Sequence, residues 1–290
     1  MTDATPPEAS PVPPSRRCRC WRYVAGFLVV LIAAIVVDGS RCVPADATKP
    51  LVYSDSTHIA IPRSPILRIA TFNIHSGKGT DRRVDLERTA GVLDSPDIVG
   101  LNEVRGSFWP DPYLDQASRL GSRLDMRSVF LPTERRWWHD HFGNGLLTKF
   151  RIGEIHRIPL SGTRGKAFRA ATLTPFEFQG RTVQLLTVHV DSQSDREHQL
   201  RTVISLFLSL QSPAILMGDL NTTSYDEQLK RLLARPDVVN PLADQPPDAR
   251  GRKHIDWILA RGFRCVSGRL IENDASDHPA VAAELELLSN

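Results

Sequence analysis

The sequence predicts an α/β fold in which two mixed β-sheets pack face to face, with helices on the outside. Three observations predict it. Apolar runs typical of strands alternate with segments of helical periodicity from about residue 65 to the end of the chain. The predicted strands outnumber the predicted helices, and hairpins occur beside crossover connections, which favours mixed sheets over a purely parallel one. A further apolar helix precedes this part of the chain.

The elements follow from local patterns, taken in chain order. The runs 66–75 ("ILRIATFNIH") and 97–104 ("DIVGLNEV") are apolar and predict buried strands, and residues 84–95 between them predict an amphipathic helix. Residues 170–192 suit a hairpin that turns at Gln179-Gly180. The same criteria predict strands at 127–132, 143–150, 151–160, 214–221, 254–260 and 280–287, and helices at 113–125, 196–210 and 224–235.

The first 64 residues lie outside the predicted core. Residues 1–22 combine the proline-rich stretch "TPPEASPVPP" with the arginine-rich stretch "SRRCRCWR", so we expect a disordered basic leader. Residues 23–37 carry no charge and predict a helix of roughly 22 Å, shorter than the roughly 30 Å hydrocarbon core of a membrane. Residues 38–64 are rich in proline, serine, threonine and aspartate and predict a linker.

The apolar helix has two interpretations. One is an uncleaved membrane anchor, with Trp21 and Tyr23 at the interface and the arginines on the cytoplasmic side. The other is a secretory signal, cleaved near the small-x-small pattern Ala45-Asp46-Ala47. We favour the anchor because this pattern lies well past the apolar run. Both interpretations put the rest of the chain outside the cytoplasm, either anchored to a membrane or secreted.

Charge and cysteine content narrow the function classes. The formal net charge is +3, and most of this excess lies in the leader, so residues 65–290 are nearly neutral. A protein that tracks a nucleic-acid backbone usually carries a visible excess of lysine and arginine, which is missing in this sequence. Four cysteines are too few for a disulfide framework, and Cys265 is expected to be a buried free thiol.

Polar side chains recur where the predicted apolar strands end or begin. A single asparagine or aspartate after a strand is usually a turn former, and a single histidine is usually structural. Their recurrence at strand after strand predicts that they converge on one crevice. The residues are Asn73, His75, Glu103, His189, Asp219, Asn221, Asp256, Asp277 and His278.

The residue types in this set indicate a chemistry. Carboxylates and amides without cysteine suit a hard cation, Mg²⁺ or else Mn²⁺ or Ca²⁺, better than a zinc thiolate site. The sequence has no Walker loop, no Gly-x-Ser-x-Gly elbow and no dinucleotide-binding fingerprint. A divalent cation with carboxylates and imidazoles is suited to the attack of water on a phosphate ester.

The motifs "TFNIH", "PDIVGLNEV", "GNGLLT", "TVHVD", "GDLN", "HIDWIL" and "SDHPAV" occur in this order over residues 66–288. With them the chain resembles the endonuclease/exonuclease/phosphatase superfamily, the metal-dependent hydrolases of the DNase I type, and its bacterial branch in particular. The resemblance implies a four-layer DNase I-like sandwich, with residues 65–290 as the catalytic domain. It also implies hydrolysis of a phosphodiester or phosphomonoester with Mg²⁺ or Mn²⁺.

The resemblance implies a metal-binding group made of Asn73, Glu103 and Asp277, with Glu103 as the principal ligand. The superfamily often has glutamine before this glutamate, where the chain has Asn102, and we expect the shorter amide to be tolerated. Some members carry an acidic residue where this chain has His75. We therefore expect one main metal site.

The resemblance also implies a catalytic group. Asp219 would orient or deprotonate the attacking water, and Asn221 would hold that water or a phosphate oxygen. His278 would face the phosphate while Asp256 fixes its tautomer, and His189 would contact the phosphate or assist the leaving oxygen. Whether Asp219 or His278 is the general base stays open.

The substrate is less constrained. Asn144 is expected to line the site. Arg164, Lys166 and Arg169 are expected to grip a phosphate, although a solvated charge run is equally compatible with these three. The candidates are nucleic acid and a phospholipid head group, and no protein partner is implied. The alternative function is a catalytically degenerate binding module displayed at a membrane. The complete catalytic group favours the enzyme.

Overall fold

The computed structural model describes residues 16–38, 42–44, 46, 48–52, 61–107, 115–136, 139–160, 168–245 and 254–289. The chain divides into two compact units, Met1–Ser40 and Arg41–Asn290. The first unit contains helix α1, Arg16–Asp38, which begins seven residues before the predicted apolar helix and takes in part of the predicted leader. The rest of the leader, residues 1–15, lies outside the described residues.

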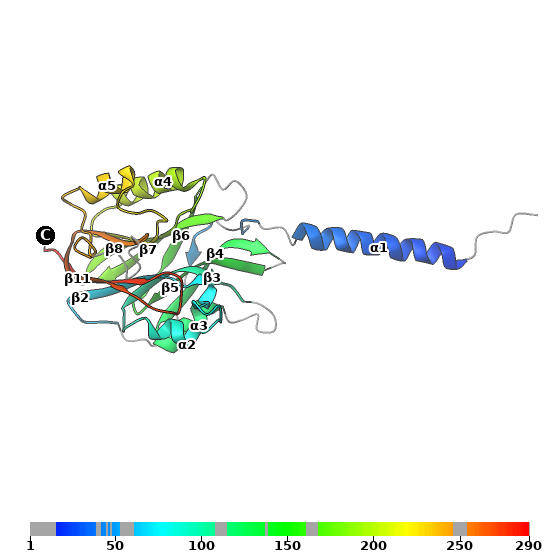
Figure 1. Cartoon of the computed structure of the whole chain (residues 1–290), viewed down its shortest axis with the longest axis horizontal. Coiled ribbons are helices and arrows are strands. Elements are labelled where there is room, and N and C mark those ends of the chain that lie inside the picture. Colours follow the sequence, from blue (N-terminus) through cyan, green and yellow to red (C-terminus); the bar gives the residue numbers. More distant parts are fainter. Residues whose placement is uncertain are drawn as a thin grey trace, which may run out of the picture. The chain divides into compact units, whose positions relative to one another are not determined.

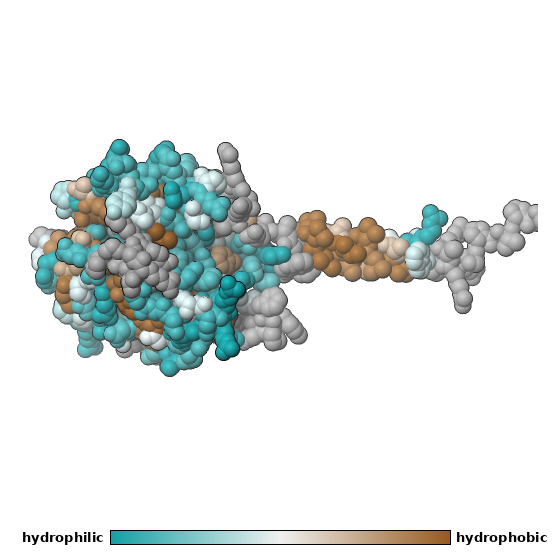
Figure 2. Space-filling view, in the orientation of Figure 1, coloured by the Kyte–Doolittle hydropathy of each residue, from teal (hydrophilic) through white to brown (hydrophobic). Residues whose placement is uncertain are grey.

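Helix α1 exposes many apolar side chains, among them Phe27, Val30 and Val37 (Figure 2). Within the described part of the chain, however, no helix combines the length and the apolar character needed to cross a membrane. The expectation of a transmembrane helix at residues 23–37 is therefore not supported.

The second unit is built on two six-stranded sheets, which confirms the predicted α/β fold with two mixed sheets. The strands of the first sheet, in spatial order, are β1 Leu51–Val52, β6 Glu154–Leu160, β7 Arg169–Phe178, β8 Arg181–His189, β9 Ala214–Asp219 and β10 Asp256–Arg261. Those of the second are β11 Phe263–Ile271, β12 Ala280–Leu287, β2 Ile66–Asn73, β3 Ile98–Arg105, β5 His139–Thr148 and β4 Arg127–Arg136.

The helices cover the outer faces of the sheets. They are η1 His75–Gly77, α2 Leu86–Gly91, α3 Gln116–Leu124, α4 Arg196–Ser209 and α5 Glu227–Leu233. Helices α4 and α5 lie on one side of the sandwich, and α2 and α3 lie on the other (Figure 1). The four layers are therefore helix, sheet, sheet and helix.

Three clusters of buried apolar side chains fill the spaces between these layers. Ile69, Phe150 and Met217 belong to the cluster between the two sheets. Phe207 of α4 packs with Trp257 in the cluster under the α4–α5 layer. A third cluster joins the second sheet to α2 and α3. The strands are apolar on both faces because each sheet is covered on both sides, which is why they read as continuous apolar runs.

Two parts of the fold differ from the sequence prediction. Strand β11 was not predicted, because it lies at a sheet edge and most of its side chains are partly or fully exposed, so it has no apolar run. Leu51–Val52 were assigned to the linker but form strand β1 beside β6. Cys265 is a free thiol, as predicted, but it is only half-buried.

Two strand pairs are parallel, and they position the predicted site residues. In the second sheet β2 pairs with β3, and in the first sheet β8 pairs with β9; all the other described strand pairs are antiparallel. The carboxyl ends of these four strands carry Asn73, Glu103, His189 and Asp219. Polar residues at the carboxyl ends of parallel strands commonly face a ligand crevice.

Candidate active site

The two sheets meet at the carboxylate of Asp219. Nδ2 of Asn73, at the end of β2 in the second sheet, donates a hydrogen bond of 3.1 Å to Oδ2 of Asp219, at the end of β9 in the first sheet. Nε2 of His189, at the end of β8, lies 3.5 Å from the same oxygen. The side chains of Asn73, Asp219 and His189 are all buried. The ends of β2 and β8 therefore converge on the carboxylate at the end of β9.

Asn221 holds the other oxygen of this carboxylate. Its backbone N–H donates to Oδ1 of Asp219 at 2.7 Å, and its Nδ2 donates to the carbonyl oxygen of Val190 at 2.8 Å. Asn221 has a φ of 48°, a left-handed conformation that asparagine tolerates better than most residues. The sequence "GDLN" thus forms a turn that points the Asp219 side chain inward.

The pKa of Asp219 is raised to about 7. The main cause is burial, which disfavours the charged carboxylate, and the negative charge of Asp256 adds to it. Asp256 is the antiparallel partner of Asp219 in the β9–β10 ladder. A carboxyl group whose pKa lies near neutrality is suited to exchanging a proton with a bound water.

Asp256 and His278 form a hydrogen-bonded pair. Nδ1 of His278 lies 2.7 Å from Oδ2 of Asp256, so the ring carries a proton on Nδ1 and turns Nε2 away from the carboxylate. Burial alone lowers the pKa of His278, but the hydrogen bond to Asp256 and its charge outweigh burial and raise the pKa to about 9. At neutral pH His278 is therefore a cation, suited to contact a phosphate oxygen.

His189 is held in the opposite protonation state by Arg169. A guanidinium NH of Arg169 lies 2.8 Å from Nδ1 of His189. Arginine can only donate, so Nδ1 is unprotonated and the ring proton is on Nε2, towards Asp219. Burial and the charge of Arg169 lower the pKa of His189 well below its ordinary value. Burial also lowers the pKa of Arg169, and the charges of Glu103 and Asp219 oppose this.

Glu103 lies in a distorted segment of β3. Its φ is 58°, a left-handed conformation that is rare for glutamate. The β3–β5 register shifts between Leu101 and Val104, so Glu103 is part of a bulge. Bulges re-aim side chains and are common beside active sites, and strained backbone clusters there too. The half-buried Glu103 contributes negative charge near Arg169.

Asp277 and its neighbours form the rim of this site. The exposed Asp277 carboxylate lies 3.4 Å from Nδ1 of His75. Oγ of Ser276 donates to the carbonyl oxygen of Asn73 at 2.7 Å, which ties the loop before β12 to the end of β2. Asp277 and His278 therefore point to different partners, Asp277 to His75 at the surface and His278 to the buried Asp256.

The donor set fits a divalent cation. Asp219, Asp256 and His278 each offer one ligand atom, and these atoms lie within 4.8 Å of one another. Oδ1 of Asp256 is buried and has no hydrogen-bond partner among the described residues. Two buried carboxylates side by side favour a bound cation, and oxygen and imidazole ligands without thiolate suit a hard ion. This group differs from the predicted ligands Asn73, Glu103 and Asp277, of which only Asn73 contacts it directly.

Several predicted substrate residues are placed differently or lie outside the described residues. Asn144 is buried, and its Oδ1 accepts a hydrogen bond of 3.0 Å from Asn102 rather than facing a crevice. Arg164 and Lys166 fall outside the part of the chain that the structure describes.

Two residues of the site were not predicted as such, Asn102 and Ser276. Arg169 was expected to grip a phosphate, and the structure places its guanidinium beside Nδ1 of His189. Asn102 was noted only as the residue before Glu103, and no local pattern indicated its contact with the other sheet.

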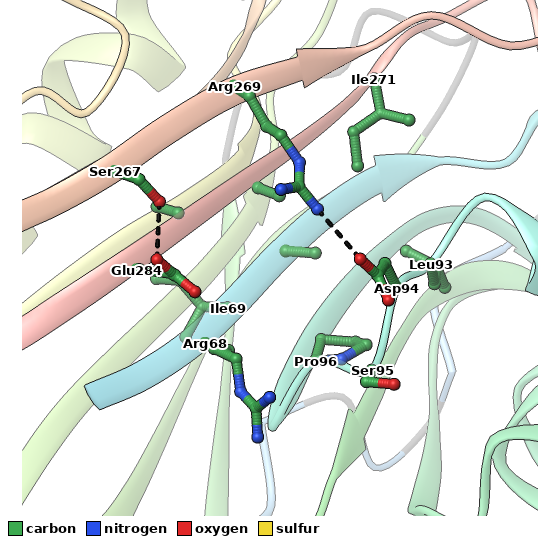
Figure 3. Close-up of a pocket in the computed structure, with 13 residues that line it drawn as sticks. Arg68, Ile69, Leu93, Asp94, Ser95, Pro96, Ser267, Arg269, Ile271 and Glu284 are labelled. Atoms are coloured by element: carbon green, nitrogen blue, oxygen red, sulfur yellow. Dashed lines mark hydrogen bonds and ion pairs between the residues drawn. The ribbon is translucent and has the colours of Figure 1, made fainter. Parts of the chain in front are cut away.

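A separate cavity lies on the outer face of the second sheet (Figure 3). It measures about 140 Å³ and is lined by β2, β11, β12 and the segment before β3. Its charged groups are already paired, because Arg269 lies 3.4 Å from Asp94 and Glu284 accepts a hydrogen bond from Ser267. None of the predicted site residues lines it.

Comparison with known proteins bears on the family and the fold. A family model described as the endonuclease/exonuclease/phosphatase family matches residues 70–278. No curated protein matches the chain significantly.

Solved structures share the fold. An endonuclease/exonuclease/phosphatase from Beutenbergia cavernae is 24% identical, with a TM-score of 0.63 over 77% of this chain and 72% of that chain. Humanised D. rerio TDP2 is 19% identical, with a TM-score of 0.57 over 77% of this chain and 99% of that one. The catalytic domain of human nocturnin, with bound sulfate, is 21% identical, with a TM-score of 0.56 over 77% and 95%. The chain belongs to the endonuclease/exonuclease/phosphatase family.

Proposed function

We propose that the protein is a divalent-metal-dependent phosphoric ester hydrolase that directs water onto a phosphodiester or phosphomonoester. The family is one of phosphoester hydrolases, which supports the reaction class. The observation that carries the proposal is the convergence on Asp219 of Asn73, His189 and the Asp256–His278 pair, from segments far apart in the chain. A structural role alone does not require two buried carboxylates beside two histidines in opposite protonation states.

The protonation states of the side chains suit them to different roles in the reaction. Asp219, with a pKa near neutrality, orients the attacking water and accepts its proton. His278 is positively charged and presents Nε2 to a phosphate oxygen, while Asp256 keeps the ring oriented. Arg169 lies behind His189 and adds positive charge beside the phosphate position. With these assignments Asp219 is the preferred general base. His278 stabilises negative charge on the phosphate and serves as an acid.

As a cation, His278 has no free ring nitrogen to offer a metal, so the proposed cation is assigned to Glu103, with Asn73 and Asp277, rather than to the Asp219–Asp256–His278 group. Bound there, it would neutralise the charge that develops on the phosphate. Mg²⁺ and Mn²⁺ are the expected ions, because the donors are mainly oxygens.

The substrate class is proposed to be a phosphodiester, in nucleic acid or in a phospholipid head group. One solved structure with this fold is D. rerio TDP2 in complex with a single-stranded DNA product, which supports the nucleic-acid arm. The near-neutral charge of residues 65–290 favours a short contact with one phosphate over a long nucleic-acid track.

Export of the catalytic unit is a further proposal and rests on the sequence of residues 23–37 alone. Fractionation of cells that express the full chain tests it. Recovery of the protein only in the cytoplasmic fraction would contradict export.

The proposed function is tested by hydrolysis of bis-p-nitrophenyl phosphate by the full chain with Mg²⁺ or Mn²⁺. A panel of plasmid DNA, RNA, phosphoinositides and sphingomyelin then identifies the substrate. We expect turnover of at least one of these substrates, and its loss with EDTA. No turnover with any tested metal and substrate would refute the hydrolase and favour a binding module with the same fold.

A further inference from the structure

Asn102 joins the two sheets directly behind the candidate active site. It lies on β3 of the second sheet, immediately before Glu103, and is 2% exposed. Its Oδ1 accepts a hydrogen bond of 2.9 Å from the backbone N–H of Asp219, and its Nδ2 donates one of 2.9 Å to the carbonyl oxygen of Val188. One side-chain amide of the second sheet is thus bonded to both β8 and β9 of the first sheet.

The two groups that Asn102 binds belong to one rung of the β8–β9 ladder. Val188 is the register partner of Gly218, and in a parallel ladder its carbonyl faces the N–H of the following residue, Asp219. Gly218 has a φ of 138°, and a Cβ atom at this position would lie 2.0 Å from the Val188 oxygen. The ladder therefore departs from regular geometry where the Asn102 amide contacts it.

A third hydrogen bond adds to the contacts of this amide. Nδ2 of Asn102 also donates to Oδ1 of Asn144 on β5 at 3.0 Å. Because the Asp219 N–H can only donate and the Val188 carbonyl can only accept, the oxygen and nitrogen of the Asn102 amide cannot be exchanged. The amide is held from three strands, and it holds the backbone of Asp219 in return.

Asn102 precedes Glu103 in the chain, so its contact with Asp219 also bears on the position of the proposed metal ligand. Glu103 follows it directly, and the bulge at Glu103 re-aims that carboxylate relative to Asn102. A rigid bond from Asn102 to Asp219 therefore sets the separation between Glu103, which would hold the cation, and Asp219, which would orient the water.

We propose that Asn102 is a positioning residue that holds Asp219 in place relative to Glu103 across the two sheets. The inference rests on the proposed function for its effect on turnover. Alanine at this position removes all three hydrogen bonds. Glutamine keeps the amide and places it one methylene further from the β3 backbone, so it retains part of the contact.

The test compares Asn102→Ala and Asn102→Gln with Thr71→Val in the full chain. Thr71 is a matched control, because it is fully buried and its hydroxyl donates to Gly100 O at 3.3 Å within the second sheet, with no bond to β9. We expect Asn102→Ala to lower kcat roughly 10²-fold, because a small displacement of a catalytic group has an effect of this size. KM and the Mn²⁺ dissociation constant, measured by electron paramagnetic resonance without turnover, should change less than about 3-fold.

The conservative variant separates positioning from a loss of stability. Asn102→Gln should recover at least about 10-fold of the lost kcat, and Thr71→Val should stay within about 3-fold of wild type. If Asn102→Ala does not fold, Asn102→Gln and Thr71→Val carry the same comparison. Equal kcat values in the Asn102 and Thr71 variants would overturn the proposal. So would an equal loss of kcat and Mn²⁺ affinity, which would assign Asn102 to the metal site.

Hydrogen exchange supplies a measurement that does not depend on activity. The amide of Asp219 should exchange faster in Asn102→Ala than in wild type, and Thr71→Val should leave it unchanged. Unchanged exchange in Asn102→Ala would overturn the proposal. If wild type hydrolyses no substrate, the proposed function fails, and the exchange rate of the Asp219 amide alone then decides whether Asn102 positions Asp219.

Discussion

Asn73 and Asp219 are 146 positions apart in the sequence and belong to different sheets, yet Nδ2 of Asn73 donates a 3.1 Å hydrogen bond to Oδ2 of Asp219. The bond is buried, so it is shielded from competing water. It fixes the separation of the carboxyl ends of β2 and β9. The same carboxylate lies beside His189 and near Asp256, so a change at Asp219 alters every part of the site.

Replacement of Asp219 by asparagine should abolish most of the activity. The amide is isosteric but cannot accept the proton of an attacking water, so we expect kcat to fall at least about 10²-fold. Asp244→Asn is the matched control, because Asp244 is exposed and lies on a turn away from the strand ends. Initial rates with a chromogenic phosphodiester measure both variants. Comparable rates in the two would remove Asp219 from the mechanism.

The Asp256–His278 pair predicts a pH dependence in the metal-free protein. The pKa of His278 is raised to about 9 in the folded state, above the ordinary value of 6.5 that applies on unfolding. Its interaction therefore stabilises the fold fully below pH 6.5 and is lost as the pH rises through 9. Asp256→Asn removes the negative charge and should lower the pKa of His278, because burial is then opposed only by the charges of Asp219 and Asp277.

Two measurements test this pH dependence. Ring resonances of His278 in a nuclear magnetic resonance titration with EDTA should move near pH 9 in wild type and at a lower pH in Asp256→Asn. The wild-type free energy of unfolding in urea, relative to that of Asp256→Asn, should decrease between pH 6.5 and 9. A difference that stays flat over this interval would show that the ion pair does not contribute.

Most of the fold and half of the site could be predicted from local patterns. Buried strands read as apolar runs, and Asp219 and His278 stand out because a polar residue at the end of an apolar run has few structural reasons to be there. The edge strand β11 has no such run, since solvent on its outer face tolerates Arg264 and Arg269.

The contacts between the two sheets could not be predicted from local sequence patterns. That Asn102 reaches Asp219 depends on the spacing of the two sheets, which arises from the packing of the whole core. The contact of Asp277 with His75 is a second example, because it depends on how the loop before β12 folds onto the end of β2. Long-range geometry of this kind is set by tertiary structure and leaves no periodicity in the sequence.

Because Glu103 is the proposed principal ligand of the cation, we expect the Glu103→Gln variant to need a higher metal concentration for turnover. Glutamine keeps the shape of the side chain and loses the charge, so Mn²⁺ should bind at least about 10-fold more weakly, while saturating Mn²⁺ restores part of the turnover. Isothermal titration calorimetry measures the affinity directly. Glu134→Gln is a control of the same type, because Glu134 is buried and, like the half-buried Glu103, places negative charge near Arg169, but it is not an expected ligand. Equal affinities in the two variants would exclude Glu103 as a principal ligand.

Gly218→Ala should destabilise the fold, because this glycine lets β8 and β9 approach each other beside Asp219. The φ of 138° is unfavourable for alanine, and the new Cβ would lie 2.0 Å from the Val188 carbonyl oxygen, which is backbone and cannot move aside. We expect a loss of at least about 2 kcal/mol in the free energy of unfolding. Gly153→Ala is the control, since a Cβ there meets no atom within 4 Å and its φ is ordinary. Urea denaturation of both variants measures the difference. A Gly218→Ala protein as stable as the Gly153→Ala protein would mean that the strands separate at little cost, and the separation of His189 and Asp219 would then not be fixed by the ladder.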